Sequence, residues 1–364
     1  MPRRDYFLLP LIFVMTMVII LIGGEITTRL LYVQVDSVEP CEYSTASGFR
    51  YKPFCTSHTK VWDGPWITQH FNDCGYRTAE SCAPRPAGSL RVDVIGSSTA
   101  RGVLVNYPES FAARASAMLS SRCDSTVDFQ NLGTEPTDVD TIDRRIPEAL
   151  ALRPAAIVMT VGPYDMIHLK DKEATRGDAI PPARFKLRDL VTLLRDSRLF
   201  LVMQAYLYRD PAFNIRAFLL NGDPADYVRT PLSAAWRQRV SDIGDLLGRI
   251  TAQTTPAHVP VLLFYIPERA QAALAALPSD PAGVDPLALG AALKAVAARH
   301  GVQLFDSTRA FASGPDFESL YYLTDGHPRE GGHAALAGVV EKALLSEPAF
   351  NRCKQPGPSG VPSR

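Results

Sequence analysis

The sequence predicts an α/β fold, namely a doubly wound (flavodoxin-like) sandwich with a five-stranded parallel sheet, preceded by an N-terminal transmembrane helix. Apolar, β-branched runs recur along residues 90–305, and stretches with helical spacing separate them. These runs are continuous rather than alternating, which is typical of parallel strands that helices cover on both faces. A longer uncharged run, residues 7–24, stands near the N-terminus.

Composition and charge exclude several classes of protein. The chain has 364 residues, of which 46% are hydrophobic and 21% are charged, so it is neither a disordered chain nor a coiled coil. Lysine plus arginine and aspartate plus glutamate both number 38, which gives a formal net charge of zero. We therefore expect no nucleic-acid partner, because no global positive field exists to attract one.

The N-terminal run, residues 7–24, reads FLLPLIFVMTMVIILIGG and is close to the roughly 20 residues that cross a bilayer. Arg3 and Arg4 precede it and no small-residue cleavage site follows, so we expect an uncleaved signal anchor. A cleaved signal peptide stays open as the alternative. Because positive residues remain inside, residues 1–6 form a cytoplasmic tip, and the chain beyond the inner membrane is periplasmic. The lipid bilayer is thus an expected partner of residues 7–24.

The six cysteines all follow this run, as an oxidising compartment allows. None of their spacings is typical of a zinc site, and we expect no metal. Six cysteines permit fifteen sets of three disulfides. Our expectation is two local pairs and a clamp on the tail, with six buried free thiols as the alternative. The expected pairs are Cys41–Cys55, Cys74–Cys82 and Cys123–Cys353.

The sequence after residue 24 predicts a neck followed by one α/β domain. Residues 25–89 lack periodicity and predict a loop-rich neck that disulfides hold, and residues 90–345 predict the main domain. The expected strands are residues 90–95, 127–132, 157–161, 259–266 and 302–305. Apolar residues at helical spacing predict helices over residues 109–121, 236–250 and 286–299.

Residues 166–255 are too many for one crossover between strands and predict a helical insertion, a candidate lid over the cleft. The apolar run from Leu199 to Tyr208 is far shorter than a membrane span and arginines flank it, so we expect a core helix there. Residues 346–364 form a tail whose Pro, Gly and Ser content predicts disorder beyond Cys353.

Residues able to do chemistry follow the predicted strands, at the edge where doubly wound sheets bind ligands. A hydroxyl, an Asp/His pair and backbone donors are the minimum set for acyl transfer through a serine ester. The sequence offers Ser98 after the first strand, Gly133 after the second, Gly162 and Tyr164 after the third, and Asp325 and His327 in the last loop.

These loops resemble the motif blocks of the SGNH or GDSL-type hydrolases. Residues 94–98 (VIGSS) are similar to the first block, 131–133 (NLG) to the second, 162–165 (GPYD) to the third and 325–328 (DGHP) to the last. The resemblance covers about residues 72–345. It implies that Ser98 is the nucleophile, that His327 is its base and that Asp325 orients the imidazole. The Asp-x-His spacing is common among secreted relatives that act on polysaccharides.

Two positions depart from the family pattern. Ser97 stands where an Asp commonly precedes the nucleophile, and Tyr164 stands where an Asn commonly donates to the oxyanion. The backbone amides of Ser98 and Gly133 would remain as donors, and the Tyr164 phenol can donate if it points inward. Gly162 is expected to contribute to the oxyanion or binding region.

Simpler roles stay open for the same residues. Ser98 can be a helix N-cap, and Asp325 can cap the final helix. Gly133 and Gly162 can be ordinary turn glycines. Ser97 is a competing nucleophile.

The first hypothesis is therefore a membrane-anchored serine esterase or O-acyltransferase outside the cytoplasm that needs no cofactor. Its implied substrate is an acylated polysaccharide or other cell-envelope glycan, and other envelope proteins are further expected partners. The second hypothesis is an inactive relative that keeps the sheet and cleft as a glycan-binding or assembly module. The replacements at Ser97 and Tyr164 motivate it, and labelling with a fluorophosphonate distinguishes the two hypotheses.

Overall fold

A five-stranded parallel sheet forms the centre of the protein. The computed structural model describes residues 5–34, 41–45, 48–123, 125–134, 139–167, 197–314 and 317–354. The strand order is β6-β5-β7-β8-β9, the order of a flavodoxin-like doubly wound sandwich, which confirms the predicted fold class. The strands are β5 (Leu90–Ile95), β6 (Val127–Asn131), β7 (Ala156–Val161), β8 (Val261–Tyr265) and β9 (Gln303–Asp306).

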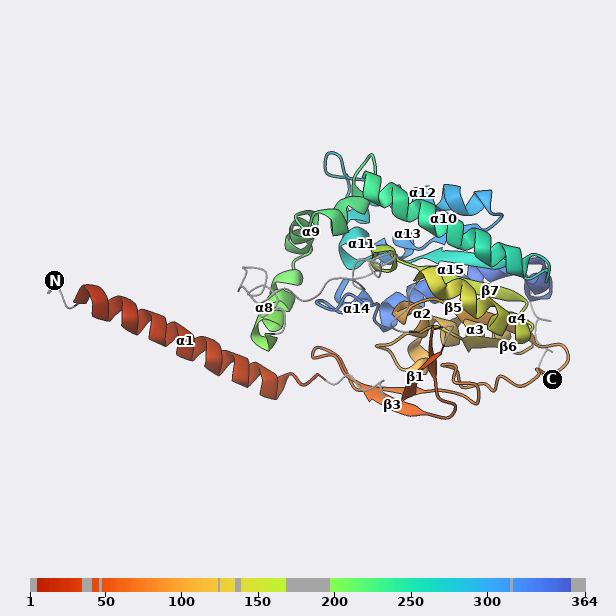
Figure 1. Ribbon diagram of the computed structural model, residues 1–364, viewed down its shortest axis with the longest axis horizontal. Helices are drawn as coiled ribbons and strands as arrows, with labels where there is room; N and C mark the ends of the chain where they lie inside the picture. The colour runs from red at the N-terminus through yellow and green to blue at the C-terminus, as the bar shows by residue number, and fades with distance from the viewer. Residues whose placement is uncertain are drawn as a thin grey trace, which may run out of the picture.

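Helices cover both faces of this sheet (Figure 1). One face packs against α4 (Ile146–Ala151), α10 (Ala234–Thr254) and α12 (Ala288–Arg299). The other packs against α3 (Phe111–Cys123) and α15 (Glu330–Ser346). Burial on both sides explains why β8 is hydrophobic along its whole length and β7 is apolar apart from Thr160.

Short helices fill the connections between these elements. The α-helices are α2 (Ser98–Arg101), α5 (Pro163–Ile167), α9 (Pro211–Leu219), α11 (Arg269–Ala275), α13 (Thr308–Ala312) and α14 (Phe317–Leu320). The 3-10 helices are η2 (Tyr107–Glu109), η3 (Val139–Arg145), η4 (Asp223–Val228) and η5 (Pro348–Lys354).

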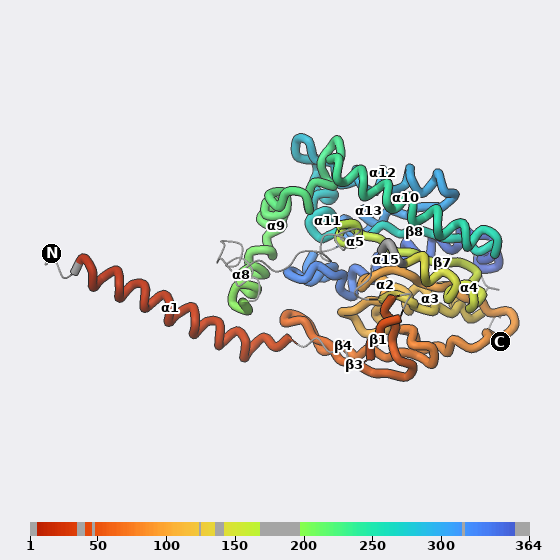
Figure 2. Tube along the Cα trace, viewed as in Figure 1, coloured from red at the N-terminus to blue at the C-terminus, as the bar shows by residue number. Residues whose placement is uncertain are grey.

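The N-terminal apolar run lies in a single helix, α1 (Asp5–Leu31), which projects from the domain (Figure 2). Within the described residues it is a candidate membrane span by length and composition, over Tyr6–Leu31. The helix continues past the predicted start of the neck at residue 25. The Glu25 carboxylate accepts hydrogen bonds from Ser197 Oγ at 2.7 Å and from the backbone N–H groups of Arg198 and Leu199 at 3.0 Å each. Glu25 therefore fixes the start of the next helix to α1.

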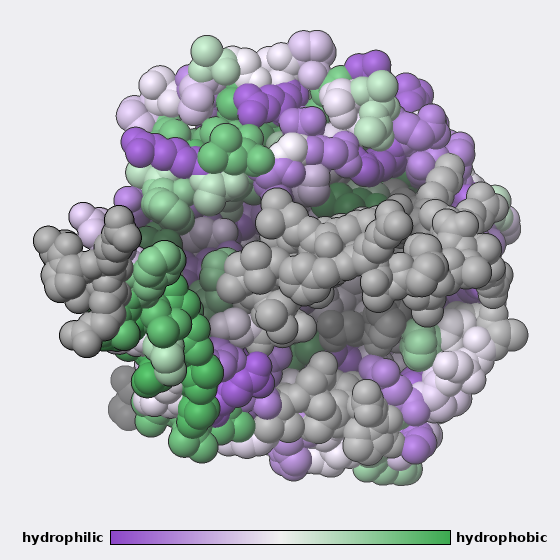
Figure 3. Space-filling model, turned by 60° about the vertical axis from the view of Figure 1, so that its left-hand side comes forward, coloured by the Kyte–Doolittle hydropathy of each residue, from purple (hydrophilic) through white to green (hydrophobic). Residues whose placement is uncertain are grey.

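That next helix is α8 (Arg198–Tyr208), where we expected a core helix. The prediction of a helix is confirmed, but its position in the core is wrong. Ala205 is buried, but four larger apolar side chains are exposed, because α8 packs beside α1 rather than under the sheet. The exposed side chains are Phe200, Met203, Tyr206 and Leu207. Apolar residues form a green stripe at the left of the view in Figure 3. Residues 168–196 of the predicted insertion lie outside the described residues.

The neck contains two antiparallel hairpins that the sequence did not predict. One pairs β1 (Glu42–Thr45) with β2 (Gly48–Tyr51), and the other pairs β3 (Thr56–Thr59) with β4 (Ile67–His70). In β3 the buried positions are Ser57 and Thr59. Because hydroxyl residues occupy them, the strand shows no apolar alternation in the sequence.

Three disulfides hold the neck and the tail, with the pairs expected from the sequence: Cys41–Cys55, Cys74–Cys82 and Cys123–Cys353. The third joins the end of α3 to η5, across a sequence separation of 230. The tail therefore packs on the domain as far as Cys353, and residues 355–364 lie outside the described residues.

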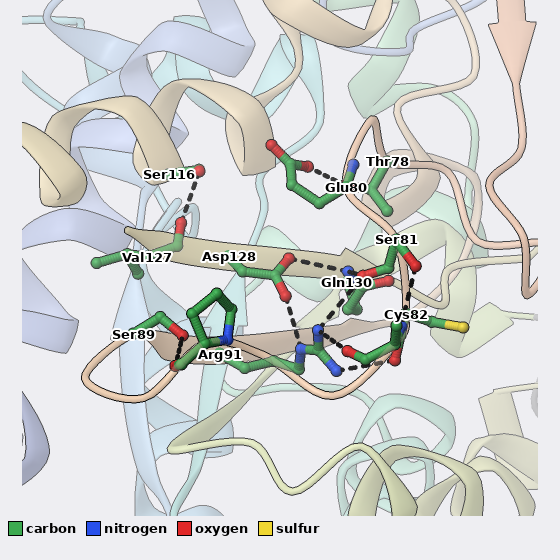
Figure 4. A network of polar contacts seen from close by, with 12 residues as sticks. Thr78, Glu80, Ser81, Cys82, Ser89, Arg91, Ser116, Val127, Asp128 and Gln130 are labelled. Carbon is green, nitrogen blue, oxygen red and sulfur yellow. Dashed lines mark hydrogen bonds and ion pairs between the residues drawn. The ribbon is translucent and has the colours of Figure 1, made fainter. Parts of the chain in front are cut away.

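The arginine of a buried ion pair within the sheet also binds the neck (Figure 4). Arg91 Nε in β5 lies 2.6 Å from Asp128 Oδ2 in β6. The same guanidinium donates to the neck carbonyl oxygens of Cys82 at 3.1 Å and Ala83 at 3.0 Å. Gln130 Nε2 adds a 2.9 Å bond to Asp128 Oδ1. The start of the sheet and the end of the neck are thus one hydrogen-bonded unit.

Candidate active site

Ser98 lies at the carboxyl end of strand β5, which pairs with β6 and β7. Gly96 follows the strand with φ +148°, and a Cβ there would lie 2.4 Å from Thr160 Oγ1, so only glycine fits this turn. Ser97 is the N-cap of α2 and Ser98 is its first residue. The chain therefore turns sharply between strand and helix and presents the half-buried Ser98 at the edge of the sheet.

His327 and Asp325 lie in the loop before α15, and this loop is folded back on itself. Tyr322 N donates to His327 O at 3.0 Å, and Gly326 N donates to Tyr322 O at 3.0 Å. Gly326 has φ +86°, which allows the tight turn between the acid and the imidazole. The Tyr322 hydroxyl donates to Leu104 O at 2.8 Å, which ties the loop to the segment that follows α2.

The structure brings Ser98, His327 and Asp325 together although the first two are 229 residues apart. Ser98 Oγ lies 2.7 Å from His327 Nε2, and His327 Nδ1 lies 2.5 Å from Asp325 Oδ1. Asp325 Oδ1 also accepts the backbone N–H of His327 at 3.1 Å. When Nδ1–H donates to the carboxylate, Nε2 carries the lone pair that can accept the serine proton. This is the geometry of a serine nucleophile, its base and an orienting acid.

The electrostatics of the pair favour an ionised Asp325. Burial opposes ionisation, but attraction to His327 and the hydrogen bonds from its ring and backbone N–H lower the pKa of Asp325 below its usual range. The side chains of His327 and Asp325 are 24% and 31% exposed. A substrate can thus reach the imidazole from solvent.

The other predicted site residues lie on the same edge of the sheet with different environments. Gly133 N–H donates to Asn131 Oδ1 at 3.0 Å, and a Cβ on Gly133 would lie 2.6 Å from Arg101 N, which explains the glycine. Gly162 N–H donates to Asp165 Oδ2 at 2.8 Å. The Tyr164 side chain is 66% exposed. The oxyanion and binding roles of Gly133, Gly162 and Tyr164 stay predictions.

The structure assigns the N-cap position of α2 to a different serine from the one expected. Ser97, not Ser98, is the N-cap of α2, and its side chain makes no capping hydrogen bond. It is Ser98 whose hydroxyl lies against His327. The geometry therefore favours Ser98 over Ser97 as the nucleophile.

Sequence reasoning missed the contacts that the neck makes with the loop of His327. Trp62 Nε1 donates to Thr324 Oγ1 at 3.0 Å, next to Asp325. Arg329 Nη2 donates to Asp63 O at 2.8 Å, and its guanidinium lies 4.5 Å from the centroid of the Tyr322 ring. The aromatic residues and Asp63 of the WDGPW run were the available signal. Thr324 lies 262 residues beyond Trp62, and no local sequence pattern indicates a contact at such a separation.

Two buried titratable groups lie near this edge. His333 Nδ1 accepts the backbone N–H of Phe111 at 3.2 Å, and burial followed by repulsion from Arg77 lowers the pKa of His333 to about 3. Glu268 follows β8 and accepts a 3.1 Å hydrogen bond from the Tyr227 hydroxyl. Burial raises the pKa of Glu268 to about 7, although the Tyr227 bond acts in the opposite direction.

One group of potential metal ligands occurs among the described residues, formed by Asp73, Cys74 and Cys82. Its two cysteines form a disulfide, so they offer no thiolate. The group lies in the neck and contains none of the site residues.

Comparison with known proteins gives a family match. A family model described as GDSL-like Lipase/Acylhydrolase matches residues 94–335, a range that includes Ser98, Asp325 and His327. A search of curated proteins found no match to the chain.

Similar solved structures are distant. They include a lipase/acylhydrolase from Enterococcus faecalis (13% identity, TM-score 0.39, covering 71% of this chain and 96% of the other). A mutant of an acetyl-xylooligosaccharide esterase from Geobacillus has 13% identity and a TM-score of 0.41, with 72% and 95% coverage. The esterase EstA from Pseudoalteromonas sp. has 8% identity and a TM-score of 0.39, with 70% and 97% coverage. At such scores, the substrates of these enzymes say nothing about the substrate of this chain.

Proposed function

Because the chain belongs to the GDSL-like lipase/acylhydrolase family, whose general chemistry is ester hydrolysis, we propose that Ser98, His327 and Asp325 are its catalytic residues. The observation that carries the proposal is the continuous contact from Ser98 Oγ to His327 Nε2 at 2.7 Å and from His327 Nδ1 to Asp325 at 2.5 Å. A serine that is only structural has no need of an imidazole that a carboxylate orients.

In the proposed reaction, Ser98 Oγ attacks the ester carbonyl while His327 Nε2 takes the hydroxyl proton. Asp325 stabilises the imidazolium that forms. The tetrahedral intermediate collapses, the alcohol leaves with the proton from His327, and an acyl group remains on Ser98. Water activated by the same imidazole then releases the acid. A sugar hydroxyl in place of water would give O-acyl transfer instead.

The negative charge that develops on the carbonyl oxygen requires hydrogen-bond donors. The Ser98 N–H is at the first position of α2, where helix geometry gives it no intrahelical acceptor. The Gly133 N–H can join it only by sharing or leaving its bond to Asn131 Oδ1. We propose that substrate binding recruits the Gly133 amide, with the Tyr164 hydroxyl at most an auxiliary donor.

We also propose where the catalytic domain lies in the cell and which class of ester it cleaves. A candidate span in α1 and three disulfides support a catalytic domain held outside the cytoplasm, at the inner membrane with the N-terminus inside. An acylated glycan of the cell envelope is the ester substrate that such a location favours, and envelope proteins are the proposed partners. The reaction needs no dissociable cofactor.

The test is labelling of the full-length protein with a fluorophosphonate, together with hydrolysis of p-nitrophenyl acetate. Ser98→Ala should abolish both, since the change removes the attacking oxygen and no capping bond. Ser97→Ala is the matched control and should keep both. Labelling that survives in Ser98→Ala but not in Ser97→Ala would move the nucleophile by one residue. Wild-type protein that takes up no label would favour the glycan-binding module over the enzyme.

A further inference from the structure

A cleft lined by arginines lies beside the loop that carries His327. Its volume is about 690 Å³, within the range of small-ligand sites. Arg209 at the end of α8, Arg269 at the start of α11 and Arg329 line it, together with Glu318. The charged residues of the lining are thus three arginines and one glutamate. The net charge of the lining is positive, so it attracts anions.

Arg269 is the residue on which the inference depends. Its side chain is 5% exposed, and among the residues that the structure describes its Nε and Nη1 groups have no hydrogen-bond acceptor. Its Nη2 donates to Tyr208 O, which holds the side chain in place. Glu318 attracts this guanidinium, but within the described part of the chain no ion pair to Arg269 forms. A buried cation without an ion pair is costly unless a ligand supplies further charge and acceptors.

The other two arginines already have partners. Arg209 Nε lies 3.6 Å from Glu318 Oε1, with both side chains about half exposed. Arg329 Nη2 lies 3.8 Å from Asp63 Oδ2. They add positive potential at the rim of the cleft, whereas Arg269 lines its wall and keeps its Nε and Nη1 groups buried without an acceptor among the described residues.

The same loops contribute to the cleft and hold the loop of His327 in place. Arg329 is two residues beyond His327, and its backbone N–H donates to Leu320 O in α14 at 2.8 Å. An antiparallel bridge joins Tyr321 to Pro328, and the Tyr321 hydroxyl donates to Pro267 O at 2.9 Å, two residues before Arg269. A molecule in this cleft therefore lies against the same loops that position the imidazole.

We propose that this cleft is an anion-binding subsite, in which Arg269 binds a carboxylate or phosphate group of the substrate whose ester reacts at Ser98. The proposal rests on the proposed function. It narrows the substrate to an acidic glycan, one that carries uronate carboxylates or phosphate diesters. Either group suits Arg269, because its negatively charged oxygens can accept single charge-assisted hydrogen bonds from the guanidinium.

The test is calorimetric titration of the full-length protein in detergent with three probes: trigalacturonic acid, inorganic phosphate and the neutral xylotriose. At least one anionic probe should bind about tenfold or more tightly than xylotriose, and added salt should weaken that binding. Preference for trigalacturonic acid would identify a carboxylate ligand, and preference for phosphate a phosphate ligand. Xylotriose binding as tightly as both anionic probes would overturn the proposal.

Arg269→Gln should weaken binding of the anionic probe by about tenfold or more, because it removes the charge and the guanidinium donors. Arg153→Gln is the matched control, since Arg153 lines a different cavity of 420 Å³. It should keep the wild-type affinity. If thermal unfolding shows that Arg269→Gln is misfolded, Arg209→Gln at the exposed rim replaces it, with an expected loss of about threefold. Unchanged affinity in the folded variant would refute the subsite.

Fluorophosphonate labelling of Ser98 separates the two proposals. Labelling without anion preference would leave the esterase standing and remove the subsite. Anion binding that Arg269→Gln weakens, in a protein that never takes up label, would keep the anion site and remove its link to ester chemistry.

Discussion

The charge of Asp325 can be tested separately from its two hydrogen bonds to His327, because the same carboxylate oxygen accepts both bonds. Asp325 Oδ1 accepts the His327 backbone N–H at 3.1 Å and Nδ1–H at 2.5 Å. In Asp325→Asn, the carboxamide oxygen can take the place of Oδ1 and keep both bonds. The imidazole then keeps its orientation and its tautomer. What the variant loses is the negative charge that stabilises the imidazolium in the transition state.

The size of that loss follows from Coulomb's law. Two unit charges about 4 Å apart interact by about 4 kcal/mol at an effective dielectric constant of roughly 20. Partial exposure of both side chains reduces this value, so we expect kcat for p-nitrophenyl acetate to fall by about 10²–10³-fold in Asp325→Asn. Asp325→Ala removes the bonds as well and should be at least about tenfold slower still.

Steady-state kinetics, normalised to the fraction that fluorophosphonate can label, provide the measurement. Asp306→Asn is the matched control: Asp306 Oδ1 accepts Thr308 N–H at 2.8 Å at the end of β9, and a carboxamide oxygen can do the same. A loss of about 10⁴-fold or more in Asp325→Asn would mean that the tautomer is not preserved. A loss below about tenfold would mean that the carboxylate charge does not assist the imidazole, and either result refutes the reasoning.

Three further predictions concern the phenol, a buried carboxyl group and the tail. Tyr164→Phe should change kcat by less than about threefold, because an exposed hydroxyl donates weakly; a loss of about 10²-fold in the kinetic assay would instead make it an oxyanion donor. The pKa of Glu268 is about 7 in the folded protein, against an ordinary value of 4.5. Ionisation of this carboxyl group therefore lowers the free energy of unfolding as the pH rises from 4.5 to about 7. Glu268→Gln, which keeps an acceptor for Tyr227, should therefore raise the free energy of unfolding by on the order of 2 kcal/mol at pH 8 and leave it unchanged at pH 4, as urea unfolding at both pH values can check. Cys353→Ser should cost about 2–5 kcal/mol in the same assay, and an unchanged midpoint would mean that the bond to Cys123 constrains little.

The strands and the site loops could be predicted because their signals are local. A strand buried on both faces is mostly apolar, and parallel strands bring the loops that follow them to one edge. Ser98, Asp325 and His327 could therefore be placed together without a structure. The apolar run in α8 gave no such guidance, because hydropathy measures transfer from water and not where in the molecule a helix lies. The contact between Trp62 and Thr324 was equally hidden, since it depends on how the neck folds over the domain.

The Cys123–Cys353 disulfide determines what a single cut in the chain does. The bond closes a covalent ring that includes β7, β8, β9 and the loop of His327, whereas Ser98 lies on the N-terminal side of the ring. A protease that cleaves once between Cys123 and Asp325 therefore produces two fragments that remain one molecule, with Ser98 on one and His327 on the other. The fragments cannot diffuse apart, so Ser98 and His327 stay at a high effective concentration relative to each other. The nicked protein should migrate as an intact chain on a non-reducing gel and as two bands after reduction.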